Sequence, residues 1–397
     1  MKHVLHLLSD VGPRSFGLGT AALHLGYQQS QLGWQVTFWS LSDEDDVRWA
    51  SAVSGVAANH FESFAGFGPG RLAYSPAMER AASHSSEKRF HVVHQHGIWT
   101  GISRVATRLR SYARVPVVIA PQGSLTPWAL GRSRLKKRIA LALYERENLG
   151  EASCLHAVAE TEVGEIRAFG LTNPVAVIPN AVADTWRHST GSAERFRERF
   201  RLPADRRIML FLSRITPKKG IPMLLEAMYQ ARSALADWML VIAGADEFGH
   251  LAQVQALVAQ LNLDEMVRFV GPLLDQPKRD AFAAAELFVL PSHSEGAPLV
   301  IPEALAVGVP VLATQGSPWS ELTTYECGWW TPISPQGIYE ALLDVARSSP
   351  ERLQRMGQRG QALIDAKYTW RRIAPRSLQL YDWLLNQAPR PDFVFID

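Results

Sequence analysis

The sequence predicts an α/β protein made of two doubly wound parallel sheets. Its 397 residues exceed the size of one ordinary domain and suit two. Short apolar runs rich in β-branched residues recur along the chain, as in parallel strands that are buried on both faces. Segments of helical period lie between these runs, and strand alternating with helix is the pattern of βαβ units.

The apolar runs form two series, one in each half of the chain. In the first half they cover residues 3–8, 35–39, 92–94, 117–120, 155–158 and 175–178. In the second half they cover residues 208–212, 239–243, 268–270, 287–290 and 309–313. Helical period is clearest over residues 19–32, 221–234, 251–261 and 370–385.

A polar stretch over residues 179–203 separates the two series and predicts the domain boundary. We therefore expect a first domain over residues 1–185 and a second over residues 186–369. The helical segment at the end gives a third piece, residues 370–397.

Composition excludes several classes of protein. A net charge of +3 gives no reason to expect a nucleic-acid partner. Cys154 and Cys327 are far apart and match no zinc spacing, which suits a reducing compartment. The apolar start of the chain is too short for a signal peptide, and no run reaches the roughly 18 apolar residues of a membrane span. We expect a cytoplasmic protein.

Open parallel sheets bind ligands at the carboxyl ends of their strands, so the loops that follow strands are the expected binding sites. Residues 9–20 carry Gly12, Gly17 and Gly19 before a predicted helix. Glycines let the backbone approach a ligand, and a helix start attracts anions. The spacing is not the G-x-G-x-x-G of dinucleotide-binding proteins. A phosphate or acceptor site and a plain glycine turn both remain open.

Two cations follow the strand at residues 208–212. Arg214 and Lys219 lie in the sequence SRITPKKG. Arginine can bind a phosphate bidentately and lysine acts as a point charge, so the pair suits a diphosphate. A solvated basic loop is the alternative.

The most informative loop follows the strand at residues 287–290. Its sequence, PSHSEGAPLVIPEALAVG, places Glu295 and Glu303 on either side of a helix start near Leu299. Glu303 is expected to accept hydrogen bonds from a ribose, and Glu295 from a sugar. Gly296 and Ala297 keep the loop close to a ligand, and backbone N–H groups at the helix start could hold phosphate oxygens. Ordinary helix-start acids are the alternative.

His94 and His96 alternate at a strand end and so share one face of the sheet. They could bind a sugar, or they could be satisfied structural histidines. A metal site is disfavoured, because no third ligand lies near them in sequence.

A basic run, Arg132, Arg134, Lys136, Lys137 and Arg138, is interleaved with apolar residues at helical spacing. Such a helix can rest on an anionic membrane surface, although a solvated helix face is the more common outcome.

These motifs together resemble the family 4 glycosyltransferases of the GT-B fold. The resemblance rests on the E-x7-E pair at 295 and 303, on the SRITPKKG loop, on IPNAV at 178–182 and on EALAVGVPVLAT at 303–314. It implies two Rossmann-like domains facing across a cleft, the first binding the acceptor and the second the nucleotide sugar. The C-terminal helix is expected to cross back to the first domain.

The resemblance also implies roles. Arg214 and Lys219 would clamp the donor diphosphate, Glu303 would bind the ribose and Glu295 would contact the donor sugar. The backbone around Ala297, Pro298 and Leu299 would lie along the phosphates. His96 and Gly17 join the expected site from the first domain. The reaction would retain the anomeric configuration and need no metal or other cofactor.

Three stretches, HQHGIW at 94–99, PQGSLTPWAL at 121–130 and GSPWSEL at 316–322, resemble enzymes of bacterial exopolysaccharide, capsule and lipopolysaccharide O-chain synthesis. The resemblance implies a hexose donor, GDP-mannose or a UDP-hexose, a glycan or lipid-linked oligosaccharide acceptor, and contact with the cytoplasmic face of the inner membrane. Many family members have histidine where this chain has Gln122, so that histidine's role does not transfer. A non-catalytic partner subunit and a sugar-nucleotide epimerase are the alternatives.

Overall fold

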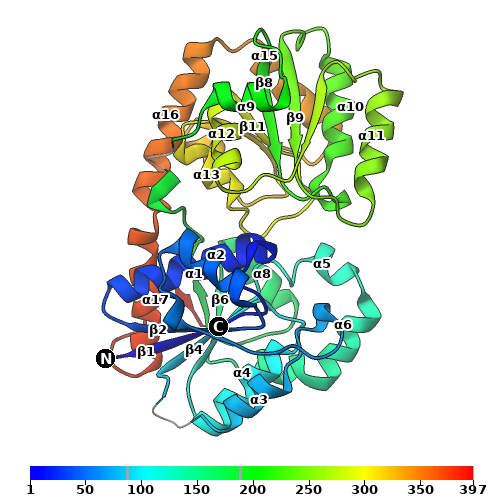
Figure 1. Cartoon of the computed structure of the whole chain (residues 1–397). Helices are drawn as coiled ribbons and strands as arrows, with labels where there is room; N and C mark the ends of the chain where they lie inside the picture. The colour runs from blue at the N-terminus through cyan, green and yellow to red at the C-terminus, as the bar shows by residue number, and fades with distance from the viewer. Residues whose placement is uncertain (86–88, 187–189, 397) are drawn as a thin grey trace. The chain divides into compact units, whose positions relative to one another are not determined.

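The structure is a computed structural model that describes residues 1–85, 89–186 and 190–396. The chain forms two compact units (Figure 1). Unit 1 comprises Met1–Ala181 together with Trp370–Asp397, and unit 2 comprises Val182–Thr369.

Among the described residues, unit 1 contains an eight-stranded sheet in the order β14-β7-β6-β5-β4-β1-β2-β3. Its strands are parallel except β14, which pairs antiparallel with β7. The strands are β1 His3–Leu7, β2 Gln35–Ser40, β3 Phe61–Ser63, β4 Val92–His96, β5 Val117–Ala120, β6 Cys154–Ala157, β7 Val175–Val177 and β14 Val394–Phe395. The short strands β3 and β14 carry no long apolar run, so the sequence pattern predicts neither of them.

The helices of unit 1 lie on both sides of this sheet. Figure 1 shows α1 and α17 on one side and α3 and α4 on the other, and α17 packs against α1. The last helix therefore belongs to the same unit as the first. Their bounds are α1 Phe16–Gln31, α2 Glu44–Ser54, α3 Pro76–Ser83, α4 Ile102–Ala113, α5 Pro127–Gly131, α6 Arg134–Ala140, α7 Arg146–Gly150, α8 Glu160–Ala168 and α17 Trp370–Leu384.

The loop after β1 is shorter than the sequence predicted. It was expected to run to Thr20, but α1 begins at Phe16 and takes in Gly17 and Gly19. A 3-10 turn at Pro13–Ser15 leads into the helix, and Ser15 donates to the Gly12 carbonyl at 2.6 Å. A Cβ on Gly19 would lie 2.0 Å from Oγ of Ser15, so this glycine makes room for that turn.

Unit 2 contains a six-stranded sheet within its described residues, in the order β10-β9-β8-β11-β12-β13, and its strand pairs are all parallel. The strands are β8 Arg207–Leu212, β9 Trp238–Ala243, β10 Val267–Gly271, β11 Leu287–Leu290, β12 Val311–Thr314 and β13 Gly328–Thr331. The helices are α9 Ala193–Phe200, α10 Ile221–Ala231, α11 His250–Gln260, α12 Asp275–Ala284, α13 Val300–Ala306, α14 Glu321–Thr324, α15 Pro335–Ala346 and α16 Pro350–Lys367. The order reverses between β8 and β11, and ligands of open sheets bind at such a reversal.

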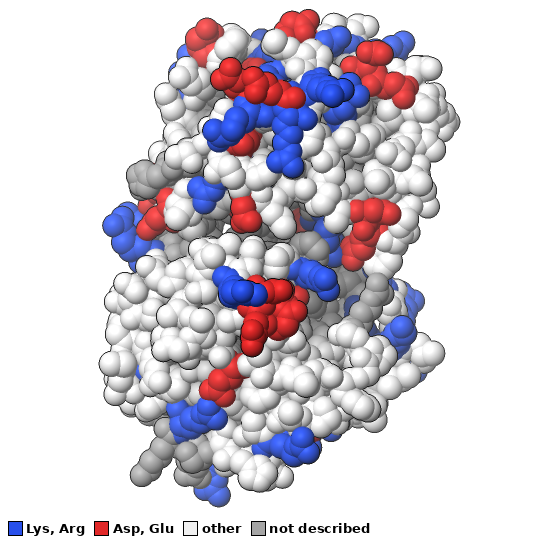
Figure 2. Space-filling model, viewed as in Figure 1, with Lys and Arg blue, Asp and Glu red and all other residues white. Residues whose placement is uncertain are grey.

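Surface features agree with the bulk composition. On the face drawn in Figure 2, basic and acidic side chains are interspersed and neither sign dominates. Across the described part of the chain, no helix combines the length and the apolar character needed to cross a bilayer.

Candidate functional site

The loops at the carboxyl edge of the unit 2 sheet touch backbone to backbone. A Cβ on Gly220, which ends the loop after β8, would lie 2.0 Å from the carbonyl oxygen of Pro291, just after β11. A Cβ on Gly244 would lie 1.8 Å from the carbonyl oxygen of Ser213. Only glycine permits these approaches, so the two glycines bring the loops after β8, β9 and β11 together.

Lys219 and Glu295 meet in this group of loops. Lys219 ends a 3-10 turn after β8, and its ammonium lies 2.6 Å from Oε1 of Glu295. Both side chains are only 9% exposed. The carboxylate also accepts from the hydroxyl of Ser292 at 2.5 Å. The E-x7-E and SRITPKKG motifs, 76 residues apart, therefore form one contact.

Neighbouring groups keep Glu295 in its charged form. Burial raises the pKa of Glu295, but Lys219, the nearby Lys218 and the hydrogen bonds from Lys219 and Ser292 outweigh burial. The net result is a pKa below the ordinary value, so Glu295 stays ionised at neutral pH. A carboxylate with its charge already partnered is better suited to positioning a ligand than to removing a proton.

Glu303 has a lysine partner that the sequence pattern does not indicate. It lies in α13, and the ammonium of Lys278, from α12, is 2.8 Å from its Oε1 and 2.7 Å from its Oε2. Burial raises the pKa of Glu303, and Lys278 and Arg279 oppose that shift without cancelling it. No local pattern in the sequence marks Lys278, because it lies 25 residues before Glu303 and the two meet only in the folded unit.

Arg214 lies in the same loop as Lys219 but has a different partner. Its guanidinium is 3.0 Å and 2.9 Å from the two oxygens of Glu247, in the loop after β9. Side-chain exposures of 42% and 30% leave both groups accessible to solvent. A bound anion could therefore compete for Arg214 at little cost.

The backbone between the two glutamates is partly exposed. Gly296 to Leu299 precede α13, and Leu299 is its N-cap residue. α13 has only seven residues and no side-chain cap, so its N-terminus by itself would attract an anion only weakly. Of the predicted donor-site residues, Arg214, Lys219, Glu295 and Glu303 thus all lie at one edge of unit 2.

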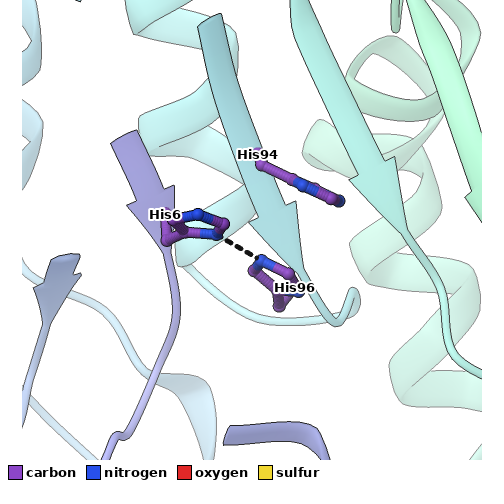
Figure 3. A group of neighbouring side chains, drawn as sticks. All are labelled: His6, His94 and His96. Carbon is purple, nitrogen blue, oxygen red and sulfur yellow. Dashed lines mark hydrogen bonds between the residues drawn. The ribbon is translucent and has the colours of Figure 1, made fainter. Parts of the chain in front are cut away.

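His96 and Gly17 lie in unit 1, which contains a row of buried histidines. His6 lies in β1 and His94 and His96 in β4, and register pairs His6 with His94. Figure 3 shows Nδ1 of His6 directed at Nε2 of His96, at 2.9 Å. His156 from β6 extends the row, with its Nδ1 3.1 Å from Nε2 of His94.

The row supplies the third histidine that the sequence analysis did not find. Nitrogens of His6, His94 and His96 all lie within 4.8 Å of one another. Sequence spacing could not find His6, since it is 90 residues from His96 and reaches it only through the pairing of β1 with β4. The His6–His96 contact has hydrogen-bond length, so the geometry shows ring-to-ring bonding rather than three nitrogens directed at one point.

A small cavity lies beside the row at the carboxyl edge of unit 1. Its volume is about 10 Å³, the size of a single water molecule. Its lining includes His96 and His156, Gln122 after β5, Asn180 after β7 and Trp370 at the start of α17. Gln122 has a φ of 49°, and buried Glu162 supports this turn by accepting from the N–H of Gly123 at 2.6 Å. Gly17 lies in the first turn of α1 and is exposed.

Family models match both units. Residues 16–181 match the glycosyl transferase 4-like domain, and residues 192–363 match the model of glycosyl transferases group 1.

Two curated relatives and one solved structure illustrate the similarity. The chain is 31% identical over 263 residues to D-inositol 3-phosphate glycosyltransferase of Streptomyces scabiei, covering 63% of this chain and 58% of that protein. It is 30% identical over 185 residues to a GDP-mannose-dependent phosphatidylinositol monomannoside mannosyltransferase of Corynebacterium glutamicum, covering 45% and 46%. The chain thus spans about half the length of these relatives. The Anabaena protein HepE in complex with UDP and glucose aligns with a TM-score of 0.77 at 18% identity, covering 97% of this chain and all of that one, and shows the same GT-B fold.

Proposed function

The chain belongs to the glycosyltransferases, with a 4-like domain followed by a group 1 domain, and from that premise we propose that it transfers a hexose from a nucleoside-diphosphate sugar to a glycan. The observation that carries the proposal is the pair of buried lysine–glutamate contacts, Lys219–Glu295 and Lys278–Glu303, at the edge where the order of strands reverses. Buried charges lower the stability of the fold unless they pair with one another or bind a ligand.

The donor would bind to unit 2 through its diphosphate and ribose. Arg214 and Lys219 would hold the phosphate oxygens, and Glu303 would accept hydrogen bonds from the ribose hydroxyls. The backbone of Gly296 to Leu299 would lie along the phosphates. Arg214 would exchange its exposed contact with Glu247 for the phosphate, a change that the exposure of both groups makes inexpensive.

Cleavage of the anomeric bond leaves negative charge on the departing diphosphate. Lys219 and Arg214 would stabilise that charge, and removing one such group typically lowers the rate by about 100- to 1,000-fold. We propose that these cations suffice without a metal ion. Glu295 would orient the donor sugar, and the departing phosphate would take the acceptor's proton on the same face, which retains the anomeric configuration.

The donor and the acceptor can be proposed more specifically. GDP-mannose and UDP-hexoses both fit a site that recognises diphosphate, ribose and sugar. The mannosyltransferase relative uses GDP-mannose and a phosphatidylinositol-linked acceptor, and HepE binds UDP. We propose a glycan or lipid-linked oligosaccharide acceptor of the kind used in bacterial surface polysaccharide synthesis.

An exposed helix supports contact with an anionic membrane. In α6 and the π-helical turn Leu141–Glu145 that follows it, Leu135, Ile139 and Leu143 recur every four residues and are 70%, 52% and 70% exposed. Exposed basic side chains flank them: Arg132, Arg134, Lys136 and Arg138. An apolar stripe beside cations suits the interface of an anionic leaflet. We therefore propose a cytoplasmic enzyme that rests on the inner membrane.

A thermal-shift screen of purified protein with UDP, GDP and their sugar conjugates tests the proposal. A ligand at 100 times its dissociation constant adds about 2.7 kcal/mol to the free energy of unfolding. We expect one nucleotide family to stabilise the protein with excess chelator present. A non-catalytic subunit would show no stabilisation, and an epimerase would convert the sugar nucleotide without an acceptor.

A further inference from the structure

The buried histidines of unit 1 form a hydrogen-bonded row whose proton positions follow from its two ends. A neutral imidazole has one N–H donor and one bare acceptor nitrogen, and the partner of one nitrogen fixes the role of the other. Burial lowers the pKa of His6 and of His156 to about 4 and that of His94 and His96 well below the ordinary value. All four rings are therefore neutral at pH 7.

The first end is the carbonyl of Ile178, which can only accept. Nε2 of His156 lies 2.7 Å from it and must carry the proton. Nδ1 of His156 is then bare, so it accepts from Nε2 of His94 at 3.1 Å. Nδ1 of His94 is bare in turn and accepts from the hydroxyl of Tyr381 at 2.7 Å. The hydroxyl proton of Tyr381 is therefore donated to His94, and Tyr381 cannot donate to another group.

The second end is the carbonyl of Ala374. It accepts the proton of Ser377 at 2.7 Å. The oxygens of Ser377 and Tyr381 lie 2.8 Å and 3.1 Å from the side-chain nitrogen of Gln29. Because both hydroxyl protons are used elsewhere, Gln29 must present its NH2 group to them. An inverted amide would place an acceptor against two acceptors.

The orientation of Gln29 decides the rest of the row. Its oxygen lies 2.7 Å from Nε2 of His6, so His6 carries its proton there and its Nδ1 is bare. That Nδ1 accepts from Nε2 of His96 at 2.9 Å (Figure 3). Nδ1 of His96 is therefore bare as well. It is buried, and no described protein group donates to it.

We propose that this row holds His96 as a fixed hydrogen-bond acceptor for one hydroxyl group of a sugar. That hydroxyl group would enter the small cavity at the carboxyl edge of unit 1. A bare nitrogen can accept from a hydroxyl but cannot donate to a carbonyl or phosphate oxygen. His96 is 4% exposed and lines that cavity with Gln122 and Asn180, which are partly exposed. Gln29 and His6 are positioning residues that act through His96. The identity of the ligand as a sugar rests on the proposed function, whereas the protonation pattern does not.

The first experiment measures the protonation pattern in the free, full-length protein. Histidine labelled with ¹⁵N distinguishes a bare ring nitrogen from an N–H, and single histidine variants assign the signals. We expect His6, His94, His96 and His156 all to be neutral with the proton on Nε2 at pH 7. A proton on Nδ1 of His96, a cationic ring, or stoichiometric binding of Zn²⁺ to His6, His94 and His96 would overturn the row as described.

Two matched variants test whether Gln29 fixes the tautomer of His96 through His6. Gln29→Met removes the acceptor of His6, so the His6 and His96 tautomers should become mixed. Tyr381→Phe removes a hydroxyl from the same network, but Ser377 still orients Gln29, so His96 should keep its bare Nδ1. Melting temperatures check that both variants fold. An unchanged His96 signal in Gln29→Met contradicts the relay.

A second pair of variants tests the contact with the ligand. An asparagine side chain places its oxygen near Nδ1 of the histidine it replaces, whereas glutamine reaches only the Nε2 position. His96→Gln should weaken binding of the sugar ligand about tenfold, the value of one hydrogen bond of about 1.4 kcal/mol, and His96→Asn should restore most of it. Equal affinities for both variants and the wild type would refute the contact.

The source of the hydroxyl is distinguished by titrating the ¹⁵N-labelled protein with three groups of probes. A His96 Nδ1 shift with UDP-glucose or GDP-mannose, but not with UDP or GDP, assigns the hydroxyl to the donor sugar. A shift only with methyl α-glucoside or methyl α-mannoside in the presence of UDP or GDP assigns it to the acceptor. No shift with any probe overturns the sugar contact. If no nucleotide stabilises the protein, the proposed function fails while the protonation pattern in the free protein is still measured.

Discussion

The ammonium of Lys219 lies 2.6 Å from Oε1 of Glu295, and each side chain is 9% exposed. Such a pair is sensitive to the loss of one member, because the other is left charged and buried. It also means that substitutions designed to test donor binding affect stability, so the two effects must be separated.

Breaking the Lys219–Glu295 pair should destabilise the protein. Lys219→Met leaves the Glu295 carboxylate without its partner, and we expect a loss of about 3–5 kcal/mol in the free energy of unfolding. The double variant Lys219→Met/Glu295→Gln removes both charges and should recover most of that loss. Denaturant titration measures the stabilities. Additive effects of Lys219→Met and Glu295→Gln would show that the two groups are not coupled.

Donor binding should respond differently to the same variants. If Lys219 holds the diphosphate, the double variant remains folded but binds UDP and GDP weakly, as calorimetry would show. Wild-type affinity in the double variant would contradict the clamp.

Glu303→Gln should weaken nucleoside diphosphates selectively. A hydrogen bond to a charged group contributes about 1.5–3 kcal/mol, so loss of the ribose contact should reduce affinity by about 10- to 100-fold. Inorganic pyrophosphate has no ribose and should bind the variant and the wild type alike. Competition titrations with both ligands provide the measurement, and equal weakening of pyrophosphate would show that Glu303 acts on the phosphates instead.

Acid should destabilise unit 1 through its neutral histidines. The pKa of His156 falls from 6.5 to about 4 on folding, because burial disfavours the charged ring. Between these values the unfolded chain binds a proton that the folded protein does not, so stability falls as pH drops from 6.5 to 4. For His156 alone this loss approaches about 3 kcal/mol.

The variant His156→Asn isolates that contribution. It should be less stable than the wild type at pH 7, and the difference should shrink as the pH is lowered to 4. Unfolding curves collected across this range make the comparison. Parallel pH dependence of the two proteins would mean that His156 is not neutral in the folded state.

Charge placed in the exposed apolar stripe of Leu135, Ile139 and Leu143 should abolish membrane binding. Leu135→Glu and Leu143→Glu put a carboxylate among residues that would enter the interface of an anionic leaflet. The control is Tyr112→Glu, which changes another exposed residue, 57% accessible, on α4. Co-sedimentation with phosphatidylglycerol vesicles should be lost in the first two variants and kept in the third. Failure of the wild type to sediment would remove the membrane proposal.

The local sequence pattern predicts the bounds of two strands next to the candidate sites. The strands at β5 and β11 have the bounds that the sequence predicted, because buried parallel strands are continuous apolar runs. The start of α1 was predicted three residues late, since Phe16, Gly17 and Leu18 show no distinct period before the helix is established. β14 has two residues and pairs at the far edge of its sheet, and no period is visible over that length.

The sequence by itself determined the two βαβ series and the placement of Arg214, Lys219, Glu295, Glu303 and His96 next to strand ends, because periodicity and strand-end loops are local properties. The tertiary structure alone decided their partners: Lys219 with Glu295, Glu303 with Lys278, Arg214 with Glu247, and His96 with His6. Those contacts join helices, strands and loops whose residues are between 25 and 90 positions apart in the sequence. Such distances are set by sheet order and register, which bring remote segments together through backbone pairing that no short stretch of sequence encodes.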